Sequence, residues 1–87
     1  MYVIIVYDVS VDKVSKLCQF LRQYLFWVQN SVFEGDLTES ELKTVEIGIK
    51  RIIDEKKDCV IIYKILRGDI LKKQHIGIRK SEPSSII

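Results

Sequence analysis

Two uninterrupted apolar runs constrain most strongly what this chain can fold into. Residues 2–9 contain one charged residue, Asp8, and residues 59–66 also contain one, Lys64. Runs of this length that are rich in isoleucine and valine are typical of strands buried on both faces of a sheet. Because the whole chain has 87 residues, both strands are expected in one small domain with a single core.

Two amphipathic segments are predicted to form helices. In residues 12–25 the apolar side chains recur every three or four residues, which is the spacing of a helix face. The second helix is predicted to begin after Thr38, because Thr38 and Glu41 have the spacing of a capping box. The polar residues 56–58 are expected to end it.

Three further segments complete the predicted order. Residues 27–37 are expected to be extended, either as one bent strand or as two short strands broken near residues 30–31. Residues 74–79 alternate in polarity and predict a short final strand, and residues 81–87 are expected to form a flexible tail. The order predicts an α+β, ferredoxin-like βαββαβ domain in residues 1–80, with two helices on one face of an antiparallel sheet.

The face of this sheet without helices is expected to be apolar as well. Strands that are apolar on both sides would leave a large apolar patch on a monomer. A second copy packed face to face would cover the patch, so we expect a homodimer.

Charge is unevenly distributed along the chain. The formal net charge is only +2, but residues 59–87 carry six basic and two acidic side chains. This C-terminal excess is either a solvated surface or an arm that contacts phosphate groups.

The cysteines and the histidine exclude a standard structural zinc site within one chain. Cys18 and Cys59 are 41 residues apart, and His75 is the only histidine. We expect reduced thiols in a cytoplasmic protein, with His75 at the surface or in an interface. No apolar run approaches the roughly 18 residues of a transmembrane helix, and no signal peptide is expected, so no membrane association is predicted.

Asp8 is the residue that points to chemistry, because its charge ends an otherwise apolar strand. The motifs of nucleotide-binding loops and of serine or zinc hydrolases are missing from the sequence. In a structural interpretation, Ser10 and the start of the following helix donate hydrogen bonds to the Asp8 carboxylate. In a functional interpretation, Asp8 is a metal ligand. Because one carboxylate binds Mg²⁺ weakly, two copies of Asp8 near a two-fold axis would share the cation.

Four segments resemble a known protein family. They are residues 7–9, 12–13, 28–35 and 58–63, and they are similar to the small CRISPR-associated "Cas two" family. The resemblance extends over residues 2–79. It implies a homodimer in which the Asp8 carboxylates of both subunits coordinate Mg²⁺ or Mn²⁺ at the interface. It also implies that the final strand, near residues 74–79, crosses onto the partner's sheet.

The resemblance implies metal-dependent cleavage of phosphodiester bonds, in single-stranded RNA or in double-stranded DNA, during the spacer-acquisition stage of antiviral defence. A second function is non-catalytic, since the dimer would hold duplex DNA between CRISPR integrase dimers. A third is that of a ribonuclease toxin of the virulence-associated D type, which shares the fold. The sequence leaves these three functions open.

The residues expected around the site fall into two sets. Tyr7 and Phe33 match positions that the family associates with the cleft, and Ser10 or Ser31 would orient a water molecule. The side chains expected to contact nucleic-acid phosphates are Lys13, Lys16, Lys72, Lys73, Arg79 and Lys80.

Four positions depart from the family's pattern. Val14 and Ser15 stand where arginines are frequent, and Trp27 and Asn30 stand where a basic residue is expected. Fewer cations near Asp8 predict weaker capture of phosphate. Trp27 is expected to be a half-buried core residue, with stacking on a base as the alternative.

Overall fold

The computed structural model describes residues 1–67 and 70–78. The elements are β1 (Tyr2–Asp8), α1 (Val11–Leu21), β2 (Phe26–Gln29), β3 (Val32–Asp36), α2 (Glu39–Ile52), β4 (Cys59–Ile65) and β5 (Leu71–Gly77). This order confirms the predicted α+β, ferredoxin-like arrangement, with β5 added at its end. The predicted tail 81–87 and the basic residues Arg79 and Lys80 lie outside the described residues.

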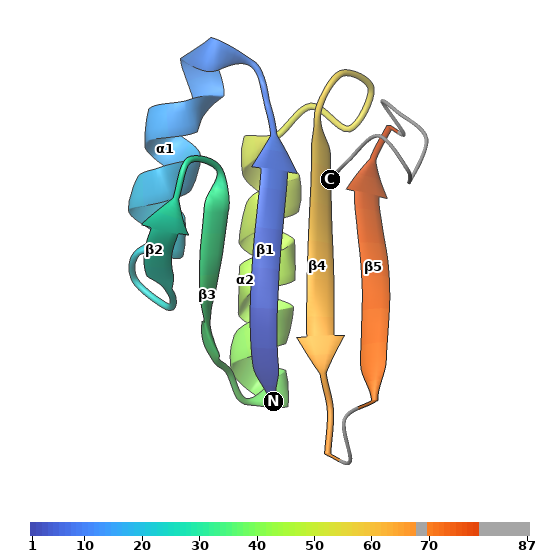
Figure 1. Ribbon diagram of the computed structural model, residues 1–87. Helices are drawn as coiled ribbons and strands as arrows, with labels where there is room; N and C mark the ends of the chain where they lie inside the picture. Colours follow the sequence, from blue (N-terminus) through green and yellow to red (C-terminus); the bar gives the residue numbers. More distant parts are fainter. Residues whose placement is uncertain (68–69, 79–87) are drawn as a thin grey trace.

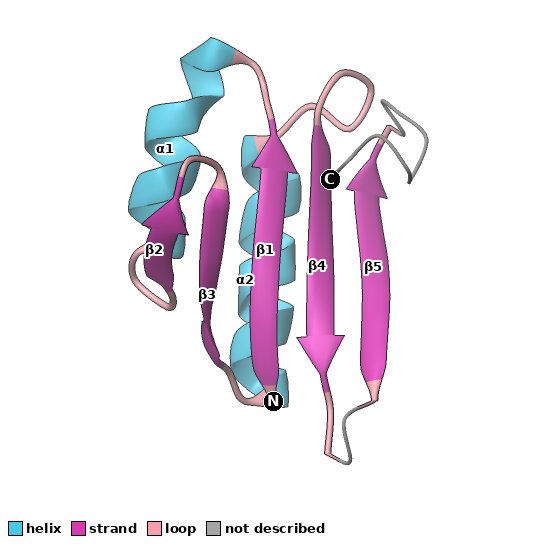
Figure 2. Cartoon of the chain, viewed as in Figure 1, coloured by secondary structure: helices cyan, strands magenta, loops and turns pink. Residues whose placement is uncertain are grey.

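The five strands form one sheet in the order β2-β3-β1-β4-β5, and all neighbouring strands are antiparallel. Both helices cover the same face of this sheet (Figures 1 and 2). The strands formed by the two apolar runs, β1 and β4, lie side by side in the interior of the sheet, as their composition predicts. Among the described residues, no helix has the length and apolar character needed to span a membrane.

The helix termini follow local chemistry. The capping box at α2 is confirmed, because Thr38 Oγ1 accepts the Glu41 N–H at 3.1 Å and Glu41 Oε1 accepts the Thr38 N–H at 2.9 Å. Helix α1 is shorter than predicted and ends at Leu21, where the chain turns. Leu25 nevertheless lies in the core, which explains why its spacing resembles that of the helix.

The extended segment after α1 forms two strands rather than one bent strand. Its turn lies at residues 30–31, where Asn30 has the positive φ of 45° that asparagine tolerates better than most residues. Trp27 is 52% exposed and lies outside the core, so the expected place in the core is wrong. Its indole Nε1–H donates to the Asn30 carbonyl at 3.0 Å and thereby braces this turn.

The core lies between the sheet and the helices. Alternate β1 residues, Val3, Ile5 and Tyr7, point into it, as the pleat of a strand requires. Lys64, the only charged residue in the second apolar run, shares this face of the sheet, and its Nζ lies 4.0 Å from Glu46 Oε2 on α2.

The opposite face of the sheet, which no helix covers, is called the open face below. The β1 side chains on it are Tyr2, Ile4, Val6 and Asp8, and their β4 partners are Ile65, Tyr63, Ile61 and Cys59. The two central strands are therefore apolar on both faces, as predicted. The partner expected to cover the open face remains a prediction.

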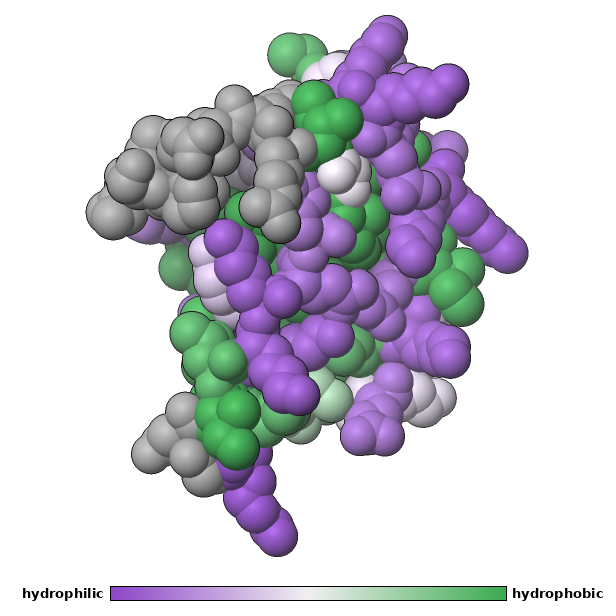
Figure 3. Space-filling model, turned by 90° about the vertical axis from the view of Figure 1, so that its right-hand side faces the viewer, coloured by the Kyte–Doolittle hydropathy of each residue, from purple (hydrophilic) through white to green (hydrophobic). Residues whose placement is uncertain are grey.

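The final strand begins at Leu71, three residues earlier than predicted, and ends at Gly77. Within this chain β5 pairs with β4 along its whole length, from Ile65 opposite Leu71 to Cys59 opposite Gly77. Figure 3 faces this edge and shows a largely hydrophilic surface, with a hydrophobic patch near the end where β5 begins. Crossing of this strand onto a partner's sheet remains a prediction.

Candidate functional site

Asp8 is the last residue of β1, and its exposed side chain follows the alternation of the strand onto the open face. Cys59, the first residue of β4, lies opposite it. The carboxylate therefore stands at the end of the two central strands, next to the apolar residues Val6 and Ile61.

A carboxylate oxygen is the donor type that Mg²⁺ and Mn²⁺ prefer. Within the described part of one chain, however, no group of three or more His, Cys, Asp or Glu side chains could hold a metal ion. One chain thus offers Asp8 as a single ligand. The residues fit a cation only if a second copy, nucleic-acid oxygens or water complete its coordination.

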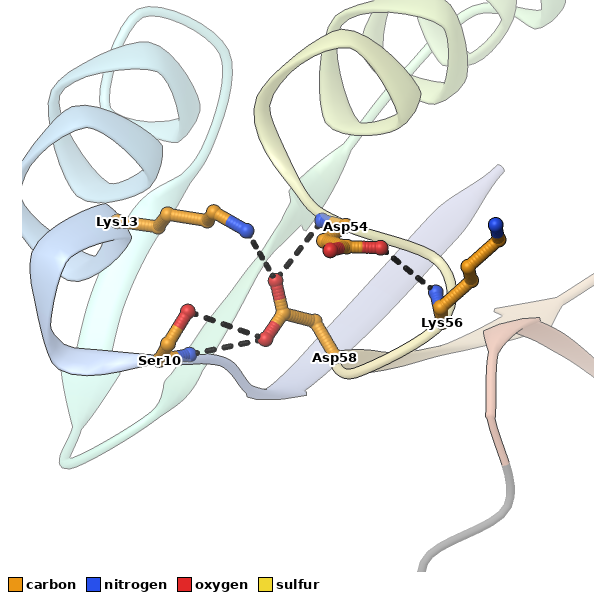
Figure 4. Close-up of polar contacts among 5 residues, drawn as sticks. All are labelled: Ser10, Lys13, Asp54, Lys56 and Asp58. Atoms are coloured by element: carbon orange, nitrogen blue, oxygen red, sulfur yellow. Dashed lines mark hydrogen bonds and ion pairs between the residues drawn. The ribbon is translucent and has the colours of Figure 1, made fainter.

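Behind this strand end lies a second carboxylate, Asp58, whose side chain is 1% exposed. Its Oδ1 accepts the Ser10 N–H at 3.0 Å and the Ser10 hydroxyl at 3.3 Å. Its Oδ2 accepts from Lys13 Nζ at 3.1 Å and from the Asp54 N–H at 2.9 Å (Figure 4). Burial on its own would raise the pKa of Asp58, but the amides of Asp54 and Ser10 and the Lys13 ammonium lower it to about 2. The carboxylate is therefore charged at neutral pH.

Two residues expected to act at Asp8 are engaged by Asp58 instead. Ser10 was expected to donate to Asp8 or to orient a water molecule, but both its N–H and its hydroxyl point to Asp58. Lys13 was expected to contact phosphate, but its ammonium forms an ion pair with Asp58. The Ser10 amide, which the structural interpretation expected at Asp8, thus donates to Asp58.

Tyr7 and Phe33 do not line an exposed cleft. They are 5% and 0% exposed, their ring centroids are 6.2 Å apart, and both belong to the core on the face opposite Asp8. Burial, helped by a 2.9 Å hydrogen bond between the Tyr7 hydroxyl and Cys18 Sγ, raises the pKa of Tyr7 to about 12. Ser31 is partly buried, and its carbonyl accepts the Tyr7 N–H at 3.1 Å. These residues support the strand that carries Asp8.

The described lysines expected to contact nucleic acid do not cluster around Asp8. Lys16 is exposed on α1, while Lys72 and Lys73 are exposed on β5 opposite Lys64 and Tyr63. Cys59 lies opposite Asp8, and the residues opposite Lys73 and Lys72 are four and five positions further along β4. At about 3.3 Å per residue, the two lysines therefore lie about 13–17 Å from Asp8 along the strand direction. Lys73 Nζ lies 5.9 Å from the centre of the Tyr63 ring.

Asp58 is the site residue that the sequence analysis missed, because it was assigned to the end of the second helix and to a segment of the family resemblance but to no site. One signal could have revealed it: like Asp8, it is a carboxylate directly beside an apolar strand, where an unpaired charge would be costly.

The element order, the sheet topology and the exposed carboxylate at the end of β1 define a ferredoxin-like α+β protein with a strand-end acidic site. The family model of CRISPR associated protein Cas2 matches residues 1–73. The chain belongs to this family.

Relatives and solved structures cover most of the chain. The protein named CRISPR-associated endoribonuclease Cas2 from Methanocaldococcus jannaschii is 51% identical over 87 residues, which are 100% of this chain and 76% of the relative. The protein of the same name from Pyrococcus furiosus is 47% identical over 100% of both chains. A crystal structure described as cas2 is 42% identical with a TM-score of 0.70, and the match covers 100% of this chain and 98% of the other. Streptococcus pyogenes Cas2 is 30% identical, also with a TM-score of 0.70, over 78% of this chain and 89% of the other.

Proposed function

We propose that this chain is a metal-dependent endonuclease of the CRISPR system, which cleaves phosphodiester bonds during spacer acquisition. The observation that carries the proposal is the position of Asp8, an exposed carboxylate at the end of β1 in a chain of the Cas2 family. The names of the relatives from M. jannaschii and P. furiosus, both CRISPR-associated endoribonucleases, favour RNA as a substrate.

The proposed active form is a homodimer that packs through the open face. Ile4, Val6 and Tyr63 are partly exposed there, next to the buried Ile61, and apolar surface of this kind is costly to leave in water. Asp8 lies at one end of the same face. A two-fold axis near that end would bring two Asp8 carboxylates together, and one Mg²⁺ or Mn²⁺ would relieve their repulsion.

In this arrangement the cation would lower the pKa of a bound water and offset charge on the phosphate. The chain contributes the Asp8 oxygens that hold it. Tyr7 and Ser31 contribute indirectly, because the hydrogen bond between the Tyr7 N–H and the Ser31 carbonyl holds the end of β1 against the turn before β3. The exposed Lys16 is the described cation of α1 that remains available for phosphate.

The test is the substitution Asp8→Asn, which keeps the shape of the side chain and removes its charge. Cleavage of single-stranded RNA and of duplex DNA in Mg²⁺ or Mn²⁺ should fall to background, while circular dichroism remains unchanged. Asp12→Asn, at an exposed carboxylate of α1, is the matched control and should cleave like the wild type. Undiminished cleavage by Asp8→Asn would overturn the assignment.

The proposed partners are the CRISPR integrase and nucleic acid. The second candidate function, a bridging subunit that holds duplex DNA, is supported by one observation: Lys72 and Lys73 are exposed and far along the strand from Asp8. DNA contact by these lysines would not need the metal site. The family match does not favour a virulence-associated D-type toxin, and the names of the relatives favour the nuclease over the bridging role.

Salt dependence of binding separates a DNA-contacting surface from a solvated one. Joint reversal of Lys72 and Lys73 to Glu should lower the slope of log affinity against log salt by at most about 3–4, since each lost phosphate contact lowers it by about 0.9 and a dimer has four such lysines. The measurement is duplex affinity over a salt series. Reversal of Lys43 and Lys50, exposed on α2, is the control. An unchanged slope in the β5 variant would reject this surface.

A further inference from the structure

Three chain segments meet at Asp58. Its side chain binds Ser10 and Lys13 after β1, and it also binds the amide of Asp54 after α2. Its backbone carbonyl accepts the Ile78 N–H at 3.0 Å, just after β5. Figure 4 shows Lys13 and Ser10 approaching the carboxylate from the α1 side and Asp54 from the α2 side.

The close approach of β5 to this point depends on a glycine. Gly77 has a φ of +97°, and a Cβ at this position would collide with the Asp58 carbonyl oxygen. The backbone here therefore requires glycine both for its conformation and for space. Asp58 thus fixes the end of β5 through its main chain and the two loops through its side chain.

Asp8 lies close to Asp58, both along the chain that follows β1 and across the sheet. Ser10, which Asp58 holds by two hydrogen bonds, is two residues beyond Asp8. Cys59, the residue next to Asp58, pairs with Asp8 across the sheet. Asp58 therefore holds the residue two positions after Asp8 through its side chain, and it adjoins the residue opposite Asp8 through the main chain.

We propose that Asp58 is a positioning residue for Asp8: by anchoring Ser10 and Lys13 behind the strand end, it sets the direction in which the Asp8 carboxylate meets a divalent cation. This inference rests on the metal site proposed above. Groups that orient a metal ligand commonly change metal affinity 10–100-fold when they are removed.

A long-range electrostatic effect is the competing explanation, and the two explanations differ in sign. If charge alone matters, Asp58→Asn should weaken cation binding, but Lys13→Met should strengthen it by removing a nearby positive charge. If positioning matters, both variants should weaken binding, because Lys13→Met also removes one of the groups that hold Asp58 in place.

The experiment measures Mn²⁺ binding alone, by the electron paramagnetic resonance signal of free Mn²⁺, with the full-length protein and no nucleic acid. Asp58→Asn should raise the Mn²⁺ dissociation constant about tenfold, at the lower end of that range. Lys13→Met should raise it by a smaller factor. Lys56→Met is the matched control, because Lys56 is an exposed lysine of the α2–β4 loop whose side chain points away from Asp58 (Figure 4). It should leave the constant unchanged or lower it.

The outcomes separate this inference from the proposed function. If Asp8→Asn binds Mn²⁺ as tightly as the wild type, the metal site itself is wrong. If Asp8→Asn loses binding while Lys13→Met binds as tightly as the wild type, or more tightly, positioning by Asp58 is wrong and the metal site stands. Lys13→Met decides the question even if Asp58→Asn does not fold, because it removes one of the groups that hold the Asp58 carboxylate and keeps the two amide donors that support folding.

Discussion

Asp58 combines burial with a low pKa, which is possible only because donors surround it. Two backbone amides, a hydroxyl and an ammonium face its two oxygens. Removing the carboxylate would leave these donors without their acceptor. An unsatisfied buried donor costs more free energy than the hydrogen bond itself contributes. The same residue therefore matters for stability as well as for the proposed positioning of Asp8.

Stability should depend on pH through Asp58. Its pKa is about 2 in the folded chain, below the ordinary 3.8, so its contribution is fully present above about pH 4 and is lost as pH falls towards 2. A difference of nearly two pKa units corresponds to about 2 kcal/mol. Urea unfolding at fixed protein concentration should show the gap between wild type and Asp58→Asn narrowing between pH 4 and pH 2. Asp12→Asn controls for the loss of a surface charge, and a gap that does not change with pH would contradict this account.

Among the elements, the contact between the two helices depends on Gly48 of α2. A Cβ at this position would collide with the ring of Phe20 on α1. The glycine disfavours the helix locally by about 1 kcal/mol relative to alanine, but it lets the two helices approach. Packing thus overrides helix propensity at this position.

Gly48→Ala tests which effect is larger. Propensity alone predicts stabilisation, whereas the collision predicts a loss of about 1–3 kcal/mol in the free energy of unfolding. We expect the loss, measured by urea unfolding. Adding Phe20→Leu, which shortens the colliding side chain, should recover part of it. A more stable Gly48→Ala protein would show that Phe20 moves aside at little cost.

At the scale of the whole molecule, the two sides of the sheet differ in what covers them. The helices bury one side, while the open face leaves Ile4, Val6 and Tyr63 partly exposed to whatever packs against it. In a chain this small, one core buries a limited fraction of the surface, so a second copy would add substantially to stability. Figure 1 shows that no element of the described chain lies across this face.

Dimerisation should fail when a charge enters the open face. Val6→Lys places an ammonium opposite Ile61, and light scattering at micromolar concentration should then give about the mass of one chain instead of two. Ile47→Lys is the matched control, because Ile47 is 46% exposed on α2, away from the open face. It should remain dimeric. A dimeric Val6→Lys protein would show that association uses another surface.

The sequence by itself determined the features that depend on near neighbours along the chain. The spacing of apolar residues predicted both helices, the capping box predicted the start of α2, and the two apolar runs predicted central strands with two apolar faces, because periodicity and caps act within a few residues. The family resemblance also came from the sequence, through residues 28–35 and 58–63. Asp8 could be singled out because its charge contrasts with its immediate neighbours.

Only the tertiary structure decided which groups donate hydrogen bonds to the Asp58 carboxylate. Ser10 and Asp58 are 48 residues apart and Lys13 and Asp58 are 45 apart, so no local pattern pairs them. The register that sets Phe33 opposite Ile5 in the core is also a property of the folded chain. Tyr7, in contrast, faces away from Asp8 because neighbouring residues of a strand point to opposite faces. A hydrogen bond needs its atoms within about 3 Å and well aligned, and for residues this far apart only the folded chain sets that distance.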